Sequence, residues 1–213
     1  MFEFINVKFK GILDIPALTI GSFGITTIKG PSGSGKSTLL KLLNKLYSPT
    51  EGRILFERVD LAELDTIQHR RKVIMLSQNA VMFQGTIRDN MLAGLKFQKR
   101  ELPGDERLLE LMDRLKLSNG LDQPAESLSG GEKQRVALAR VMLLEPDIYL
   151  LDEPSSALDE DTAQLIIHML SEHVREGRRS LIMVTHSKAI AQRYSNAIVE
   201  VVGGKCVNRE EVL

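Results

Sequence analysis

Residues 30–38 constrain the fold of this chain more than any other part of its sequence. They read Gly, four residues and then Gly-Lys-Ser, which is the pattern of a phosphate-binding P-loop. The apolar run 25–28 before them predicts a buried strand, and residues 37–46 after them predict a helix with apolar side chains at helical spacing. The alternative, a glycine-rich turn that binds nothing, would not require a strand and a helix on either side. The stretch therefore predicts a nucleoside triphosphate site.

The residue types in this loop predict their separate roles. Its glycines let backbone N–H groups turn toward a phosphate, and the following helix adds the positive end of its dipole. Lys36 is expected to reach the β- and γ-phosphates, and the Ser37 hydroxyl is expected to coordinate Mg²⁺. The expected nucleotide-binding residues of the loop are Gly30, Pro31, Ser32, Gly33, Ser34, Gly35, Lys36, Ser37 and Thr38.

Further apolar runs end, as the P-loop strand does, in polar residues. They are residues 73–76 before Gln78, 148–151 before Asp152 and Glu153, and 181–184 before His186. Such runs are typical of parallel strands covered on both faces, and ligands bind at the carboxyl edge of such sheets. Apolar and polar residues alternate over residues 1–28, which predicts antiparallel strands, and a further strand pair is expected around residues 53–56. We therefore expect an α/β fold of the P-loop NTPase type, with a mostly parallel core sheet and an N-terminal antiparallel β subdomain.

Residues 82–135 differ in character from the rest of the chain, because their pattern is helical. Residues 86–95 and 105–117 each predict a helix. The second has one apolar face, formed by Leu108, Leu111, Met112 and Leu115. We expect a single domain over residues 1–213, in which 1–81 and 136–213 form the nucleotide-binding core and 82–135 form an inserted helical subdomain.

Charge, cysteine count and hydropathy exclude several kinds of partner and site. Lys+Arg and Asp+Glu both number 28, so no net field attracts nucleic acid or an anionic membrane. Cys206 is the only cysteine, so neither an internal disulfide nor a cysteine metal cluster can form. No apolar run approaches the ~20 residues that a membrane-spanning helix needs. Any role at a membrane is therefore expected to depend on a partner.

The acidic pair Asp152 and Glu153 follows a predicted strand and matches the Walker B arrangement. Asp152 is expected to hold Mg²⁺ through water, and Glu153 to polarise the attacking water as general base. An acidic pair after a strand is by itself more often a helix cap or a surface turn. Its occurrence in a chain that also has a P-loop favours the catalytic interpretation.

Residues 128–135 form the most discriminating stretch of the sequence. Ser129 and Glu132 have the spacing of a capping box, which would start a helix without any further function. Capping alone does not require the consecutive glycines Gly130 and Gly131, which weaken a first helical turn. Glycines at a helix start are explained if a phosphate must approach the backbone closely.

With these motifs, the sequence resembles the ATP-binding cassette (ABC) ATPases over nearly its whole length. Residues 128–135 are similar to the family's signature motif, and residues 156–159 to its D-loop. Gln78 matches the Q-loop glutamine and His186 the switch histidine. The motifs also occur in the family's order along the chain.

The resemblance implies a head-to-tail homodimer of two cassettes, with each ATP between the P-loop of one and the signature helix of the other. Ser129 and Gly131 would then act on the partner's ATP, and Asp159 would help to couple the two sites. Within one protomer, Gln78 would sense Mg²⁺ and the attacking water, and His186 would hold the γ-phosphate.

The function that the resemblance implies is that of the ATP-hydrolysing subunit of an ABC transporter. Such a subunit powers transport through separate integral membrane subunits and lies as a peripheral protein on the cytoplasmic face of the cell membrane. The alternative is a non-transport ABC ATPase that acts on nucleic acid or the ribosome, but the chain has neither the long coiled coil nor the second cassette of those proteins. We therefore expect no nucleic-acid partner. Residues 78–90 are more similar to exporter-type cassettes, including small stand-alone cassettes of the FetA type.

Three details are predicted with less support from the motifs. Where the family stacks adenine on an aromatic residue, this chain has Gly11; the nearby Phe9 is expected to be a core strand residue. Discrimination between ATP and GTP should therefore be modest.

The charged cluster 69–72 is expected to be a solvated surface. Residues 81–83 either form the groove that receives a helix of the membrane subunit, as the resemblance implies, or anchor the helical insert.

Overall fold

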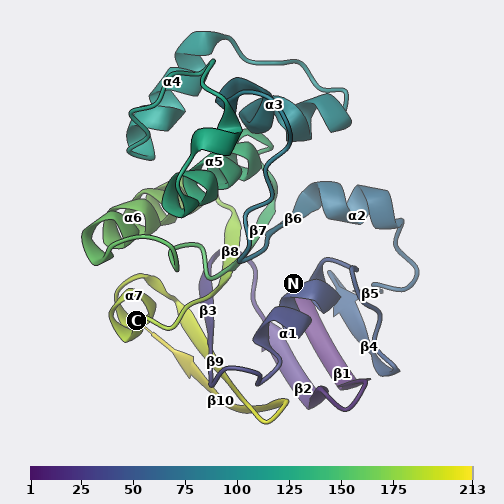
Figure 1. Ribbon diagram of the computed structural model, residues 1–213. Coiled ribbons are helices and arrows are strands. Elements are labelled where there is room, and N and C mark those ends of the chain that lie inside the picture. Colours follow the sequence, from purple (N-terminus) through teal and green to yellow (C-terminus); the bar gives the residue numbers. More distant parts are fainter. Residues whose placement is uncertain (213) are drawn as a thin grey trace.

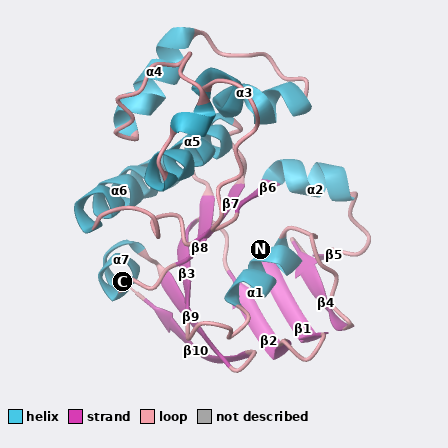
Figure 2. Ribbon diagram, in the orientation of Figure 1, coloured by secondary structure: helices cyan, strands magenta, loops and turns pink. Residues whose placement is uncertain are grey.

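In the computed structural model, which describes residues 1–212, the chain forms two β-sheets with helices around them (Figures 1 and 2). The strands are β1 (Phe2–Phe9), β2 (Leu13–Ile20), β3 (Gly24–Lys29), β4 (Glu51–Phe56), β5 (Val59–Asp60), β6 (Val73–Leu76), β7 (Ile148–Asp152), β8 (Ser180–Val184), β9 (Ala197–Val202) and β10 (Lys205–Glu211). The helices are α1 (Lys36–Leu43), α2 (Thr66–Lys72), α3 (Ile87–Phe97), α4 (Asp105–Arg114), the 3-10 turn η1 (Ala125–Ser127), α5 (Gly130–Leu143), α6 (Glu160–Glu176) and α7 (Lys188–Tyr194).

The larger sheet is six-stranded, in the order β10-β9-β3-β8-β7-β6. Strands β9, β3, β8, β7 and β6 run parallel, and only β10 at the edge runs antiparallel to its neighbour. Successive residues of β7 face opposite sides, so Ile148 and Leu150 join one hydrophobic cluster while Tyr149 and Leu151 join another. The sheet is therefore covered on both faces, which confirms the predicted α/β fold with a mostly parallel core sheet.

The smaller sheet is antiparallel and has the order β2-β1-β4-β5. The alternating side chains of β1 that were expected in a core are buried, at Phe2, Phe4, Val7 and Phe9. They share a hydrophobic cluster with α1 and with one face of the core sheet. This confirms the predicted N-terminal antiparallel strands, and it places β4 and β5, which follow α1 in the chain, in the same sheet.

Helices α3, α4 and α5 lie together at the end of the molecule away from the antiparallel sheet (Figure 1). Their buried residues belong to one cluster with those of α6 and of one face of β7 and β8. The apolar face expected of the second helix is buried as predicted, and Leu108 and Leu115 have no exposed surface. Helix α5 continues across residues 135 and 136, so the expected boundary between helical insert and core falls inside a helix.

Two predicted helices are shorter at their ends than the apolar periodicity indicates. Helix α4 ends at Arg114 rather than at 117, because Lys116 adopts a left-handed backbone (φ 56°) and the Leu117 N–H turns back to the Met112 carbonyl. Helix α1 ends at Leu43 rather than at 46, because Lys45 is left-handed as well (φ 58°). Apolar side chains that follow the end of a helix can still pack in the hydrophobic core. The apolar periodicity of the sequence therefore extends beyond the last helical residue.

The prediction that residues 69–72 form a solvated surface is wrong for His69, whereas Arg70, Arg71 and Lys72 are exposed as expected. The His69 side chain is 3% exposed, and its Nε2 lies 2.8 Å from the Leu43 carbonyl oxygen. Arg70 donates to the carbonyl oxygens of Asn44 and Lys45. The end of α1 leaves carbonyl groups without helical partners, and these two side chains satisfy them. Burial lowers the pKa of His69, which favours a neutral ring in this position.

Candidate active site

The P-loop connects β3 to α1 and has the backbone geometry that its glycines predict. Gly30, Gly33 and Gly35 have φ values of 150°, 76° and 99°. A β-carbon on Gly30 would overlap the carbonyl oxygen of Val201, so a side chain cannot be placed there. At Gly33 no atom lies within 4 Å of the β-carbon position, so there the positive φ alone requires glycine.

Lys36 begins α1 and is 6% exposed. Its Nζ donates to the carbonyl oxygens of Gly30 at 2.9 Å and Pro31 at 2.8 Å, so the ammonium group lies across the inside of the loop. The hydroxyl oxygen of Ser34, also within the loop, is buried and has no hydrogen-bond partner. Backbone N–H groups, one lysine and a helix start together form a concave site for an anion.

Asp152 ends β7 in the interior of the sheet and is 5% exposed. Burial raises the pKa of its carboxyl group, and the nearby Ser37 side chain partly offsets that rise. A hydroxyl and a carboxylate side by side are hard oxygen donors of the kind that Mg²⁺ takes. The pair predicted to hold Mg²⁺ is therefore adjacent in the structure, and its chemistry fits the ion.

Gln78, Glu153 and His186 come together at the carboxyl edge of the core sheet. Gln78 Nε2 donates to Glu153 Oε2 at 3.0 Å, and His186 Nε2 lies 3.0 Å from Glu153 Oε1. The three residues come from the loops that follow β6, β7 and β8, which are neighbours in the sheet. The Glu153 carboxylate therefore lies between an amide and an imidazole, at the place where the strand pattern predicts polar groups to converge.

The P-loop and these three residues enclose a cavity of about 380 Å³. It is lined by Ile12, Ser32, Gly33, Gly35, Lys36, Ser37, Thr38, Gln78, Glu153 and His186. Most of the predicted nucleotide-binding residues of the loop thus line one cavity with the predicted catalytic residues.

The signature residues do not line this cavity. Ser129 caps α5 in the expected capping box, with its backbone N–H and its hydroxyl donating to Glu132 Oε2 at 2.8 and 2.7 Å. These hydrogen bonds lower the pKa of Glu132. A β-carbon on Gly131 would press against the Ala157 carbonyl oxygen, whereas Gly130 has open space around it. Gly131 is thus needed for packing, and Gly130 leaves the helix start accessible.

Asp159 also lies outside the cavity, at the start of α6. Its carboxylate accepts a hydrogen bond from the Thr162 N–H at 2.9 Å, and this contact lowers the pKa of Asp159. Helix α6 follows directly over residues 160–176, with Gly177 after its last turn. Asp159 is therefore the N-cap of α6.

Ile12 is a cavity residue that the sequence motifs did not indicate. It lies in the turn between β1 and β2 and is 44% exposed. Phe9, the nearest aromatic residue, is 4% exposed and stacks on Tyr47 with ring centroids 5.0 Å apart, which confirms its assignment to the core. The aliphatic surface next to the P-loop therefore comes from the residue that follows Gly11. An isoleucine directly after Gly11, where the family's adenine-stacking aromatic is expected, is the sequence signal that could have found it.

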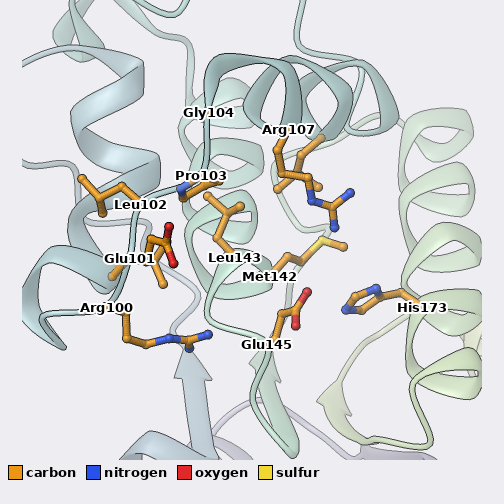
Figure 3. Close-up of a pocket in the computed structure, with 12 residues that line it drawn as sticks. Arg100, Glu101, Leu102, Pro103, Gly104, Arg107, Met142, Leu143, Glu145 and His173 are labelled. Atoms are coloured by element: carbon orange, nitrogen blue, oxygen red, sulfur yellow. The ribbon is translucent and has the colours of Figure 1, made fainter.

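A second cavity, of about 450 Å³, lies near the C-terminal end of α5, where Arg107, Glu145 and His173 face it (Figure 3). Several of its charged side chains have partners within the chain. Arg100 donates to the Leu144 carbonyl oxygen at 2.6 Å, and Glu145 lies 3.5 Å from Arg179. This cavity is larger than the one at the P-loop, but it holds no phosphate-binding backbone. The P-loop cavity is therefore the candidate active site.

Among residues 1–212, no helix has the length and the apolar composition to cross a membrane.

Over residues 13–156, the sequence matches the protein family described as ABC transporter. The chain is 39% identical to protein STAR1 of Oryza sativa subsp. japonica, over 92% of this chain and 55% of that protein. It is 36% identical to the phosphonates import ATP-binding protein PhnC of Bordetella parapertussis, over 93% of this chain and 84% of that protein.

The chain is also 38% identical to the probable iron export ATP-binding protein FetA of Escherichia coli, over 81% of this chain and 76% of that protein. Among solved structures, it resembles the ATP-binding cassette MJ0796 in a dimeric post-hydrolysis state bound to ADP and Pi. The TM-score is 0.88 at 28% identity, over 100% of this chain and 99% of that one. The family match, the relatives and the P-loop fold agree: the chain belongs to the ABC transporter family, as an ATP-binding cassette ATPase.

Proposed function

We propose that the chain is the ATP-hydrolysing subunit of an ABC transporter and that Glu153 is the general base of its hydrolysis. The observation that supports this most directly is the convergence of Gln78, Glu153 and His186 on the cavity that Lys36 and the P-loop line. A carboxylate held between two polar side chains, beside a phosphate site, is suited to take a proton from water. The non-transport alternative has no feature of the chain in its favour.

The proposed mechanism assigns one task to each group. The P-loop backbone binds the triphosphate, and Lys36 exchanges its contacts with the loop carbonyls for contacts with the β- and γ-phosphates. Glu153 accepts the proton of the attacking water. Gln78 and His186, which touch both oxygens of that carboxylate, orient the water and the γ-phosphate.

We propose Ser37, Asp152 and Gln78 as the residues that hold Mg²⁺. The ion, when bound, neutralises charge on the phosphate oxygens. The support is the adjacency of the Ser37 hydroxyl and the buried Asp152 carboxylate, since burial of an unpaired carboxylate is unfavourable and a cation would offset it. We also propose that Ile12 provides the apolar surface against the nucleotide base.

Hydrolysis of ATP by the purified chain should therefore require a divalent cation. Chelation with excess EDTA should abolish phosphate release, and added Mg²⁺ should restore it. The measurement is phosphate release against time, with an Asp152→Asn variant as a second way to remove the site. Hydrolysis that continues unchanged in EDTA would contradict the assignment of Ser37 and Asp152.

We propose that two copies of the chain assemble head to tail, so that the signature residues of one complete the site of the other. Ser129, Gly130 and Gly131 lie outside the cavity of their own chain, and the start of α5 is accessible at Gly130. A similar cassette forms a dimer bound to ADP and Pi.

We further propose the division into a core, residues 1–81 and 136–213, and a helical subdomain, residues 82–135. Helix α5 joins the two.

We propose that an apolar patch of Val81, Phe83 and Phe97 binds a helix of the membrane subunit. Their exposed fractions are 62%, 39% and 72%. The two rings meet edge to face with centroids 5.5 Å apart, and the Arg140 guanidinium lies 4.8 Å from the centroid of Phe83. Exposed aromatic rings that support each other are typical of a surface that a partner covers.

Phe83→Ala and Phe97→Ala should weaken assembly with the membrane subunit while leaving basal ATPase activity intact. A helix bound in an apolar groove depends on one or two buried anchors, so each loss should exceed about 1 kcal/mol. Co-purification with the membrane subunit and a thermal melt of each variant are the measurements. Phe23→Ala is the matched control, because Phe23 is 63% exposed and lies in another part of the molecule. Unchanged assembly in both variants would place the docking site elsewhere.

A further inference from the structure

Glu153 has an unusual backbone conformation for a residue with a side chain. Its φ is 51°, in the left-handed region that favours glycine. A residue stays in this region only where surrounding contacts hold it there. Its N–H donates to the Val184 carbonyl oxygen at 3.1 Å, which ties it to β8. Its carbonyl oxygen accepts from the Ser156 N–H at 3.2 Å and from the Gln134 side chain at 2.8 Å.

Of the three hydrogen bonds to the Glu153 backbone, the one from Gln134 is made by a side chain. Gln134 lies in α5 and is 2% exposed. Its Nε2 donates to the Glu153 carbonyl oxygen, and its Oε1 accepts from the Ala157 N–H at 3.1 Å. One buried amide thus holds both the residue that carries the proposed general base and the segment 156–159 that follows it. Because both ends of the amide are engaged, its orientation is fixed.

We propose that Gln134 is a positioning residue for Glu153, which holds the carboxylate toward the cavity by fixing the left-handed backbone beneath it. The proposal rests on the proposed function, because it concerns the orientation of the general base. The hydrogen bond to the Glu153 carbonyl is the part that positions the base. The hydrogen bond from Ala157 fixes the amide so that Nε2 faces that carbonyl.

The position of Gln134 on α5 also links two sites. The same helix begins with Ser129, Gly130 and Gly131, which are proposed to act on the partner's nucleotide. A shift of α5 would therefore move the backbone of Glu153 in the same protomer. The signature helix and the general base of one chain are connected through one side chain.

The alternative is that Gln134 only satisfies buried polar groups and contributes to folding. Two substitutions separate these roles. Gln134→Met keeps the volume and removes both hydrogen bonds. Gln134→Glu keeps the acceptor for Ala157, and its carboxyl group can donate to the Glu153 carbonyl only when it is protonated. Burial raises the pKa of a carboxyl group at such a site, so protonation falls within an accessible pH range.

The experiment measures ATP turnover against pH for the wild type, both variants and the control Gln68→Met, which changes an exposed glutamine of α2. Gln134→Met should lower kcat by roughly ten- to a hundredfold, as expected when a catalytic group is misplaced, with KM for ATP changed less than about twofold. Gln134→Glu should have a similar defect at about pH 8 and should recover toward the wild-type kcat at about pH 6. The ratio of variant to wild-type kcat removes the pH dependence common to both.

Two results would overturn the proposal: a normal kcat in Gln134→Met, or a defect in Gln134→Glu that does not recover at low pH. If Gln134→Met melts near the assay temperature, Gln134→Glu decides the question, with its thermal melt measured at both pH values because protonation of a buried glutamate would also relieve a folding defect. Recovery of kcat at low pH supports the positioning role if the variant is fully folded at the assay temperature at both pH values, and recovery that only follows refolding of the variant contradicts it. Glu153→Gln separates this inference from the proposed function. Loss of turnover in Glu153→Gln with normal Gln134 variants refutes only the positioning role, whereas normal turnover in Glu153→Gln refutes the general base itself.

Discussion

Replacement of Glu153 by glutamine should remove ATP turnover and leave ATP binding intact. The substitution keeps the size of the side chain, and the new amide oxygen can still accept a hydrogen bond from Gln78, but it removes the carboxylate that accepts a proton from water. General-base catalysis contributes about 10²- to 10⁴-fold, so turnover should fall by that factor. Because hydrolysis no longer consumes the nucleotide, ATP should accumulate at the site and stabilise the dimer.

Single-turnover hydrolysis and gel filtration with ATP and Mg²⁺ measure the two effects of this substitution. Glu172→Gln is a suitable control, since Glu172 is an exposed glutamate of α6 away from the cavity lining. Near-normal turnover in Glu153→Gln would remove this residue from its assigned role. A loss of both turnover and ATP binding would indicate damage to the cavity instead.

Ser129→Arg should block hydrolysis without weakening ATP binding to the isolated chain. Ser129 lies outside the cavity of its own protomer, so the P-loop of the variant stays intact. An arginine at the start of α5 would occupy the open space beside Gly130, where the proposed dimer brings the partner's γ-phosphate. Ser118→Arg is the matched control, because it adds the same side chain to an exposed serine after α4.

Mixing Ser129→Arg with Lys36→Ala tests whether the site is shared between two chains. Half of randomly formed dimers are mixed, and each mixed dimer has one intact composite site. The mixture should therefore recover about a quarter of the wild-type turnover when sites work independently. Normal turnover by Ser129→Arg alone, or a mixture as inactive as its components, would contradict independent composite sites.

The sequence was sufficient to predict the P-loop and the convergence of Gln78, Glu153 and His186. Each of these residues follows an apolar run, and parallel strands bring such ends to one edge of a sheet, so a local pattern determined a tertiary arrangement. The contacts that residues 69–72 make could not be predicted in the same way. His69 is buried only because the end of α1 presents an unpaired carbonyl group to it across 26 positions of sequence.

Gln134 and Ile12 show the same limit at the site. Gln134 lies inside the predicted signature stretch, but its role depends on a main-chain carbonyl 19 residues away, whose position is set by β7 and not by any residue type. Ile12 becomes a cavity residue because the turn between β1 and β2 lies next to Gly35. The ends of α1 and α4 could not be predicted, because the left-handed residues that follow them are Lys45 and Lys116, and lysine does not favour a left-handed backbone.

The alternation of β7 between two hydrophobic clusters has a consequence for how the molecule unfolds. The helical end and the antiparallel sheet are not linked by a flexible connection, because each has the opposite face of the same strands as its inner wall. Melting of one cluster would expose a face of β7 and β8 to water and so weaken the packing of the other. The two ends should therefore unfold as one cooperative unit, and the amides of β7 and β8 should be the last to exchange their hydrogens with solvent.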